Sequence, residues 1–316
     1  MKKLTTALLT GALSLILAAC GNGNQGASDT AAPSDASAAE TAAVETAADI
    51  TAEPTAEKPT VIKVGVVGEN NEDWDDVIRR FKEGEGIDVE LVHFTEYTQP
   101  NEALAAGDID LNSFQHKIFL NNYIQESGQE LVSIGDTVLA PIGLFSSQIK
   151  SVDEIKDGDR IAIPNDVTNE ARALFLLQTA GLIKVNGNPG EPITLDDIAE
   201  NPKNLEITEL DASQTARALD DVTASVINNA YATNAGLNPI EDSIFLEPVD
   251  DNSEPYVNII AARPEDQDNP WYQKLVKEYY QTPETEKVLA ETSKGSSLAA
   301  WKSLPTQESA ATEPSK

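Results

Sequence analysis

The chain has 316 residues, a formal net charge of −31 at pH 7, two histidines and one cysteine. So large a negative charge repels nucleic acid and anionic lipid headgroups, which argues against DNA, RNA and peripheral membrane binding. A single cysteine excludes an internal disulfide, and so few cysteines and histidines argue against a zinc or manganese site. The sequence also lacks a glycine-rich phosphate loop and a G-x-S-x-G motif. We therefore predict no metal, no cofactor and no enzymatic activity.

The N-terminal residues have the pattern of a secretion signal. Two lysines precede an apolar stretch, residues 4–17, that is too short to span a membrane, and small residues then lead into Cys20. This pattern resembles the lipobox of bacterial lipoproteins, whose cysteine is acylated. We predict a signal peptide over residues 1–19 and lipidation at Cys20, which would hold the protein on the extracytoplasmic face of the cell membrane. An ordinary secretion signal with a chance cysteine is the alternative.

Two further segments contain almost nothing to bury. Residues 21–59 consist of Ala, Thr, Ser, Gly, Pro and acidic residues with little else, so ordering them would cost conformational entropy without compensating burial. We predict that residues 20–59 are the lipidated cysteine and a disordered acidic tether. Residues 303–316 are expected to be a disordered tail.

The globular part begins with alternating strands and helices. Residues 61–67 form an apolar, β-branched run, which is typical of a strand covered on both faces. A helix with apolar residues at 74, 77, 78 and 81, a strand over residues 87–94 and a helix between Pro100 and Gly107 follow. A short strand after Gly107 then leads into another helix. This order predicts parallel strands joined by helices.

The alternation resumes after an apolar stretch at residues 137–145, which we interpret as a crossover into a second lobe. A capping box at residues 151–154 is followed by a predicted strand over 160–164 and a helix over 170–180. Further strands are expected at 205–210, 222–227 and 256–262, and the last helices should pack on the first lobe. We therefore predict lobe 1 at residues 60–144 plus 256–302 and lobe 2 at residues 145–255.

Several polar residues lie where such strands end, which is where open α/β sheets bind ligands. Phe114 and His116 lie at a strand-to-helix turn, although they are equally explained as a core ring and a solvated residue. Arg172 is expected in the first turn of its helix, where a cation opposes the helix dipole and calls for an anion such as a carboxylate. Pairing with Asp166 or exposure to solvent are the alternatives.

Two amides and an acidic loop complete the candidates. Asn228 ends a predicted strand and Asn258 lies inside one, so each needs a hydrogen-bond partner, either a neighbouring loop or a ligand. Residues 250–252 are interpreted as a solvated acidic loop, and an all-oxygen calcium site there is the alternative.

Taken together, these stretches resemble the methionine-binding lipoproteins of the MetQ/NlpA type, the substrate-binding components of methionine ABC importers. Seven blocks carry the resemblance: V-G-V-V-G at 64–68, Y-T-Q-P-N-E-A-L at 97–104, G-D-I-D-L-N-S-F-Q-H-K at 107–117, N-D-V-T-N-E-A-R at 165–172, E-N-P-K-N-L at 200–205, V-I-N-N-A-Y-A at 226–232 and P-Y-V-N at 255–258.

The resemblance implies a type II periplasmic-binding-protein-like fold, with two lobes that are mainly parallel sheets flanked by helices and a ligand cleft between them. It implies a methionine ligand, expected as the L enantiomer, together with ABC permease and ATPase partners. We expect a monomer. The thioether would lie among Tyr97, Phe114, His116 and Phe119, and the zwitterion against Arg172, Asn228 and Asn258. Thioether sulfur against aromatic rings is favourable by about 0.3 to 1.5 kcal/mol per contact.

Two positions depart from the family pattern. Ile118 and Phe119 stand where the family commonly has Pro-Tyr, and Val167 stands where it commonly has Pro. Phe119 keeps the ring but lacks the hydroxyl, which affects selectivity. A methionine-containing dipeptide or another apolar amino acid is therefore an alternative ligand. A surface adhesin or antigen without a transport role is an alternative function of another class.

Overall fold

The computed structural model describes residues 57–302, which belong to one compact unit. The predicted signal peptide, Cys20, nearly all of the tether and the predicted tail lie outside the described residues. The described part contains a six-stranded sheet, a five-stranded sheet and a two-stranded ribbon. Within this part, no helix is both long and apolar enough to cross a membrane.

The first sheet has the strand order β13-β4-β12-β3-β1-β2. Strand β1 pairs in parallel with β2 and β3, whereas β12 runs antiparallel to β3 and β4, and β13 antiparallel to β4. The prediction that the strands run mainly parallel is therefore wrong for this sheet. Strand β12, which returns from the second lobe, runs antiparallel to β3. The strands are β1 (Val61–Val67), β2 (Asp88–Phe94), β3 (Leu111–His116), β4 (Val132–Leu139), β12 (Val257–Ala262) and β13 (Leu298–Ala299).

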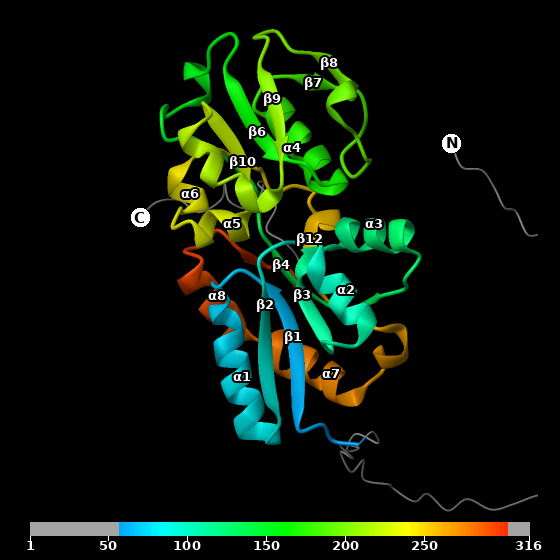
Figure 1. Cartoon of the computed structure of the whole chain (residues 1–316). Coiled ribbons are helices and arrows are strands. Elements are labelled where there is room, and N and C mark those ends of the chain that lie inside the picture. Colours follow the sequence, from blue (N-terminus) through cyan, green and yellow to red (C-terminus); the bar gives the residue numbers. More distant parts are fainter. Residues whose placement is uncertain (1–56, 303–316) are drawn as a thin grey trace, which may run out of the picture. The chain divides into compact units, whose positions relative to one another are not determined.

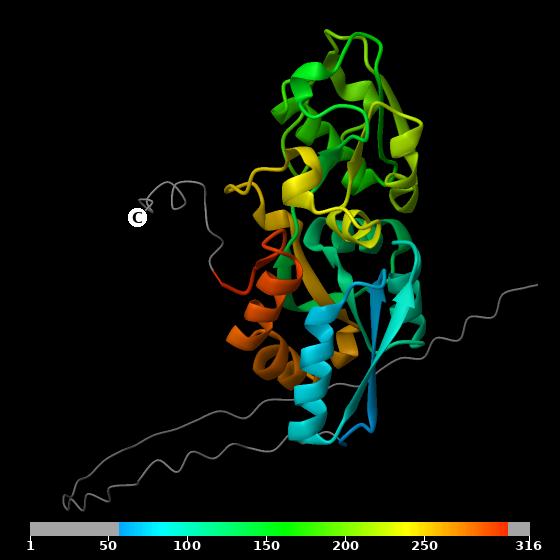
Figure 2. The same ribbon diagram turned by 90° about the vertical axis from the view of Figure 1, so that its left-hand side faces the viewer.

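Helices cover both faces of this sheet (Figures 1 and 2). Helix α1 packs with the C-terminal helices on one face, against Ile62, Val64 and Ile260, while α2 and α3 pack on the other face. Neighbouring residues of β12 alternate between the two apolar clusters, as the pleat of a strand requires. The helices are α1 (Glu72–Glu85), α2 (Gln99–Ala106), α3 (Lys117–Ser127), α7 (Pro270–Lys274), a π-helix (Leu275–Tyr280) and α8 (Pro283–Thr292).

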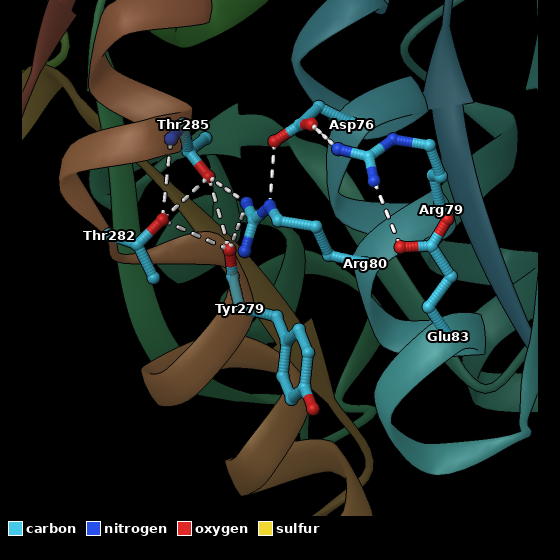
Figure 3. Close-up of polar contacts among 7 residues, drawn as sticks. All are labelled: Asp76, Arg79, Arg80, Glu83, Tyr279, Thr282 and Thr285. Atoms are coloured by element: carbon cyan, nitrogen blue, oxygen red, sulfur yellow. Dashed lines mark hydrogen bonds and ion pairs between the residues drawn. The ribbon is translucent and has the colours of Figure 1, made fainter.

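An arginine ties α1 to the C-terminal segment (Figure 3). Arg80 Nη2 donates to the carbonyl of Tyr279 at 2.7 Å and to Thr285 Oγ1 at 2.8 Å, and its Nε donates to Asp76 at 2.7 Å. The same guanidinium thus joins residues that lie 199 and 205 positions away along the chain. The prediction that the last helices pack on the first lobe is confirmed.

The second sheet has the order β11-β5-β10-β6-β9 and is also mixed. Strands β10 and β9 lie parallel to β6, whereas β5 runs antiparallel to β10 and β11. Helix α4 is buried along most of its length against this sheet, since ten of its residues are buried. The elements are β5 (Gly143–Phe145), β6 (Arg160–Pro164), α4 (Val167–Thr179), β9 (Glu206–Leu210), β10 (Ala224–Ile227), α5 (Asn229–Asn234), α6 (Pro239–Asp242) and β11 (Ser243–Leu246), with β7 (Lys184–Val185) and β8 (Ile198–Glu200) as the ribbon.

Two segments connect the sheets. Residues 140–142 lead from β4 to β5, and residues 247–256 lead from β11 back to β12. The predicted crossover at residues 137–145 thus includes the end of β4 and all of β5. The predicted capping box at 151–154 begins only a three-residue 3-10 turn, in which Ser151 accepts from the backbone of Asp153. The domain limits given above remain a prediction.

Candidate functional site

The predicted site residues come from strand ends that meet between the two sheets. Phe114 and His116 lie at the end of β3, Asn258 lies on β12, and Asn228 follows β10. Asn258 is the register partner of His116 across the antiparallel pair, so the two side chains are neighbours on one face. Ligands of open α/β sheets bind at such carboxyl ends.

An aromatic wall forms one side. The ring of Tyr97 lies 5.9 Å from that of Phe114 and 6.0 Å from that of Phe119, while Phe114 and Phe119 meet edge to face at 5.8 Å. Tyr231 of the other lobe adds a ring 4.9 Å from Tyr97. Rings at these separations stabilise one another beyond their buried area, so the wall is a preformed apolar surface.

His116 is buried and neutral. It is the N-cap of α3, where its Nδ1 accepts the backbone N–H of Phe119 at 3.1 Å. Burial, and then the nearby Arg172 cation, lowers the pKa of His116 to about 3. Because Nδ1 accepts, the single proton of the neutral ring lies on Nε2. Nε2 is buried and has no partner at ordinary hydrogen-bond distance and angle among the described residues, although the Asn169 side chain lies near enough to oppose the lowering of the His116 pKa.

Arg172 is bound differently from the prediction. Its Nε and Nη2 donate to the two carboxylate oxygens of Glu247 at 2.8 and 2.5 Å, and Nη2 also donates to the carbonyl of Ala140 at 3.2 Å. The guanidinium lies 4.4 Å from the ring centre of Tyr256. Glu247, rather than Asp166 or solvent, is thus the anion beside this cation, and the charge argument from the sequence does not by itself require a ligand carboxylate.

The helix that carries Arg172 also begins earlier than predicted. Helix α4 starts at Val167, and Asp166 is its N-cap, accepting the backbone N–H of Asn169 at 3.0 Å. The predicted helix over residues 170–180 starts too late, and the predicted place of Arg172 in the first turn is wrong. Arg172 therefore lies in the second turn, where the dipole of the helix end is weak.

The Asn169 and Asn228 side chains form a buried chain with Asp166. Asn169 Nδ2 donates to both oxygens of Asp166, at 2.9 and 3.0 Å, and Asn169 Oδ1 accepts from Asn228 Nδ2 at 2.7 Å. Asn228 Oδ1 is buried and has no hydrogen-bond partner among the described residues. A buried amide oxygen without a partner is costly and calls for a donor.

A cavity of about 200 Å³ brings these groups together. Pockets for drug-sized ligands have volumes of about 300–1,000 Å³, so this smaller cavity suits a single small metabolite. The cavity also borders Asn169 and the backbone end of β4 at Ala140. All seven predicted ligand-binding residues line it: Tyr97, Phe114, His116, Phe119, Arg172, Asn228 and Asn258.

Sequence reasoning missed three contributors. Glu247 lies 75 positions from Arg172, and nothing in its local sequence distinguishes it from the many surface acids. Tyr256 packs against both His116 and Arg172, and Tyr231 extends the aromatic wall.

At residues 250–252, Asp250 accepts the backbone N–H of Asn252 at 2.8 Å. The described residues contain no group of three acidic, histidine or cysteine side chains arranged for a metal.

Comparison with known proteins identifies the family. The sequence profile of the NlpA lipoproteins matches residues 62–301. The D-methionine-binding lipoprotein MetQ of Salmonella typhimurium is 45% identical over 243 residues, which cover 76% of this chain and 88% of that protein. A nutrient binding protein from Burkholderia cenocepacia, solved bound to methionine, has a TM-score of 0.72 and 47% identity, covering 76% of this chain and 99% of that one.

A further solved structure agrees. The substrate binding protein of a methionine transporter from Streptococcus pneumoniae has a TM-score of 0.72 and 43% identity, covering 77% of this chain and 96% of that one. The predicted two-lobed fold class is thereby confirmed. Because the family profile covers most of the chain and the relatives match over nearly their whole length, this chain belongs to the NlpA lipoprotein family.

Proposed function

We propose that this protein is an extracytoplasmic, lipid-anchored binding protein that captures methionine and delivers it to an ABC importer. The observation that carries the proposal is a pair of buried polar atoms in one cavity, of which one is a hydrogen-bond donor and the other an acceptor. His116 Nε2 is a donor without a partner and Asn228 Oδ1 is an acceptor without a partner, both among the described residues. A free amino acid supplies both complements, a carboxylate and an ammonium.

Arg172 supports the carboxylate end. Glu247 and the Ala140 carbonyl accept from Nε and Nη2, so Nη1 is left for a ligand in the cavity that Arg172 lines. A carboxylate there would complete a fork of donors with the imidazole N–H, which assigns His116 to the carboxylate rather than to the thioether that the resemblance implied. The adjacent Glu247 keeps the guanidinium fixed, so little side-chain entropy would be lost on binding.

The side-chain end is aromatic. Tyr97, Phe114 and Phe119 offer ring faces and edges to an apolar ligand group, and a thioether gains about 0.3 to 1.5 kcal/mol per ring contact. The names of the relatives support methionine as this ligand. A methionine-containing dipeptide or another apolar amino acid remains the second candidate, because Phe119 has no hydroxyl with which to close the pocket around one side chain.

Isothermal titration of the full chain tests the proposal. We expect saturable binding of methionine, tighter than that of leucine or of a glycyl-methionine dipeptide, in titrations that include both methionine enantiomers. Phe114→Ala should reduce the preference for methionine over smaller amino acids. The absence of saturable binding to any of these ligands would favour the adhesin or antigen alternative.

Attachment to the membrane is a separate part of the proposal. Two observations support it: the sequence before Cys20 resembles a lipoprotein signal, and the family is named for lipoproteins. Cys20→Ala should release the protein from washed membranes while methionine affinity stays unchanged, because none of the cavity residues lies near it in the sequence. Retention of the variant in the membrane fraction would remove the lipid anchor from the proposal.

A further inference from the structure

The orientation of the Asn228 amide is set by its neighbour Asn169. Asn228 is the N-cap of α5, a position where an asparagine side chain commonly accepts a backbone N–H of its own helix. Here it makes no such hydrogen bond. Its only side-chain hydrogen bond among the described residues is the one that Nδ2 donates to Asn169 Oδ1 at 2.7 Å.

The orientation of Asn169 is in turn set by Asp166. Both carboxylate oxygens of Asp166 face Asn169 Nδ2, at 2.9 and 3.0 Å, and one also accepts the Asn169 backbone N–H. Burial raises the pKa of the Asp166 carboxyl, but each side-chain hydrogen bond of Asp166 among the described residues is one that it accepts, including one from Thr168 Oγ1 at 3.0 Å. Asp166 thus acts as an ionised carboxylate, which only accepts hydrogen bonds. Asn169 must therefore turn its NH₂ toward Asp166 and its oxygen toward Asn228, which then has to present its own NH₂ to Asn169 and its oxygen to the cavity.

We propose that Asp166 is a positioning residue that, through Asn169, fixes the Asn228 amide with its oxygen toward the cavity and so selects ligands that carry an α-ammonium group. The proposal rests on the proposed function, because it assigns the ammonium end of the same site. A flipped Asn228 would aim an NH₂ group at the ligand ammonium and would replace a hydrogen bond by repulsion.

Asp166→Asn tests this inference with little change in shape. An asparagine at this position keeps a side-chain oxygen that can cap α4, but its NH₂ lets Asn169 turn over, and Asn228 then turns over with it. The measurement is the ratio of dissociation constants for methionine and its des-amino analogue, 4-(methylthio)butanoate. We expect the preference for methionine to fall by about 10- to 100-fold, since hydrogen bonds to charged groups contribute about 1.5–3 kcal/mol, while affinity for the analogue stays nearly constant.

Asp159→Asn is the matched control. Asp159 also accepts a backbone N–H, that of Lys156 at 2.7 Å, but it lies before β6, whereas Asp166 lies after it. The two aspartates therefore flank opposite ends of one strand. The control should leave the ratio of dissociation constants unchanged.

The exchanged pair Asp166→Asn/Asn169→Asp provides a rescue. The carboxylate at 169 would accept from the amide at 166 and from Asn228 Nδ2, which restores the outward Asn228 oxygen and the preference for methionine. If wild type prefers methionine over the analogue while folded Asp166→Asn has the same ratio, the inference is overturned. If Asp166→Asn does not fold, an exchanged pair that folds without the preference overturns it equally. Failure of wild type to bind methionine would instead overturn the proposed function.

Discussion

At the residue scale, Arg172 has two roles that its sequence context did not separate. It binds Ala140 in one connecting segment and Glu247 in the other, and it stacks on Tyr256 where the second segment ends. The Arg172 side chain is 4% exposed and that of Glu247 is 18% exposed, so each charge is stabilised mainly by the other rather than by water. Removing the arginine would therefore affect folding as well as binding.

A double substitution separates the two roles. Arg172→Met should weaken methionine binding by about 2–5 kcal/mol, because a desolvated carboxylate loses its partner. It should also lower the melting temperature, because the half-buried Glu247 loses its charged partner. Adding Glu247→Gln removes the unpaired charge, so the melting temperature should recover while affinity stays low. Titration calorimetry and thermal melts measure the two quantities. Recovery of methionine affinity in the double variant would show that Arg172 does not hold the ligand carboxylate.

His116 predicts a dependence of stability on pH. Its folded pKa of about 3 lies below the ordinary value of 6.5. As pH falls through 6.5 the unfolded chain takes up a proton that the folded protein does not, so stability is fully present above pH 6.5 and declines toward pH 3. The slope contributed is at most about 1.4 kcal/mol per pH unit.

Denaturant unfolding between pH 4 and 7 measures this slope. The free energy of unfolding of His116→Gln should vary less with pH than that of wild type. His93→Gln is the control, because the His93 side chain is 37% exposed and remains hydrated in the folded protein. Equal slopes for wild type and His116→Gln would contradict the buried, neutral state of His116.

At the element scale, the Arg80 guanidinium of α1 bridges to the C-terminal segment (Figure 3). Arg80→Met keeps the apolar stem but removes the charged donor to the Tyr279 carbonyl and to Asp76. Among the described residues, the Tyr279 carbonyl then keeps only the hydroxyls of Thr282 and Thr285, and Asp76 keeps only Arg79. We expect a loss of about 1.5–3 kcal/mol in the free energy of unfolding, with methionine affinity unchanged. Arg79→Met is the control. Arg79 pairs with Asp76 and Glu83 but is 56% exposed, so its loss should cost at most about 1 kcal/mol. Equal losses for the two variants would contradict the bridging role of Arg80.

The elements that were predicted well from sequence carry their signal locally. Strands β1 and β6 are continuous apolar runs, and α1 has its apolar spacing and an αL glycine, Gly86, at its end. The antiparallel entries of β5 and β12 depend on partners far along the chain, so local patterns could not fix their direction. The start of α4 was misplaced because three residues close together, Asp166, Thr168 and Asn169, all favour cap positions.

The site residues also divide into those with a local sequence signal and those that depend on distant partners. Phe114 and His116 were found because a strand end and a helix start are local signals. Arg172 was singled out by a charge mismatch that rested on a misplaced helix start. Tyr97 and Phe119 came only from family resemblance. Glu247 could not be found, since its importance comes from an ion pair across 75 residues and the chain contains 53 acidic residues.

At the scale of the whole molecule, polar contacts join the lobes beside the cavity. Asn234 Oδ1 of α5 accepts the backbone N–H groups of Glu69 and Asn70, at 3.2 and 3.3 Å, and the Tyr231 hydroxyl donates to the Thr95 carbonyl at 3.2 Å. Gly68 permits this approach, because its φ is 82° and an added Cβ would lie 1.9 Å from Asn234 Nδ2. These contacts exist only when the lobes are together, so they favour a closed state.

Asn234→Ala should therefore shift the lobes toward an open state without changing what the cavity recognises. Apparent affinity scales with the fraction of binding-competent molecules, so methionine and weaker ligands should lose affinity by one common factor, about 5- to 10-fold for about 1 kcal/mol of lost hydrogen bonding. Small-angle scattering should show compaction of wild type on adding methionine, and a larger ligand-free radius for the variant. Asn238→Ala is the control, since Asn238 caps α6 through the N–H of Ile240 within one lobe. If the loss differs between ligands, Asn234 acts on recognition, and if the radius does not respond to methionine, the lobes do not close on it.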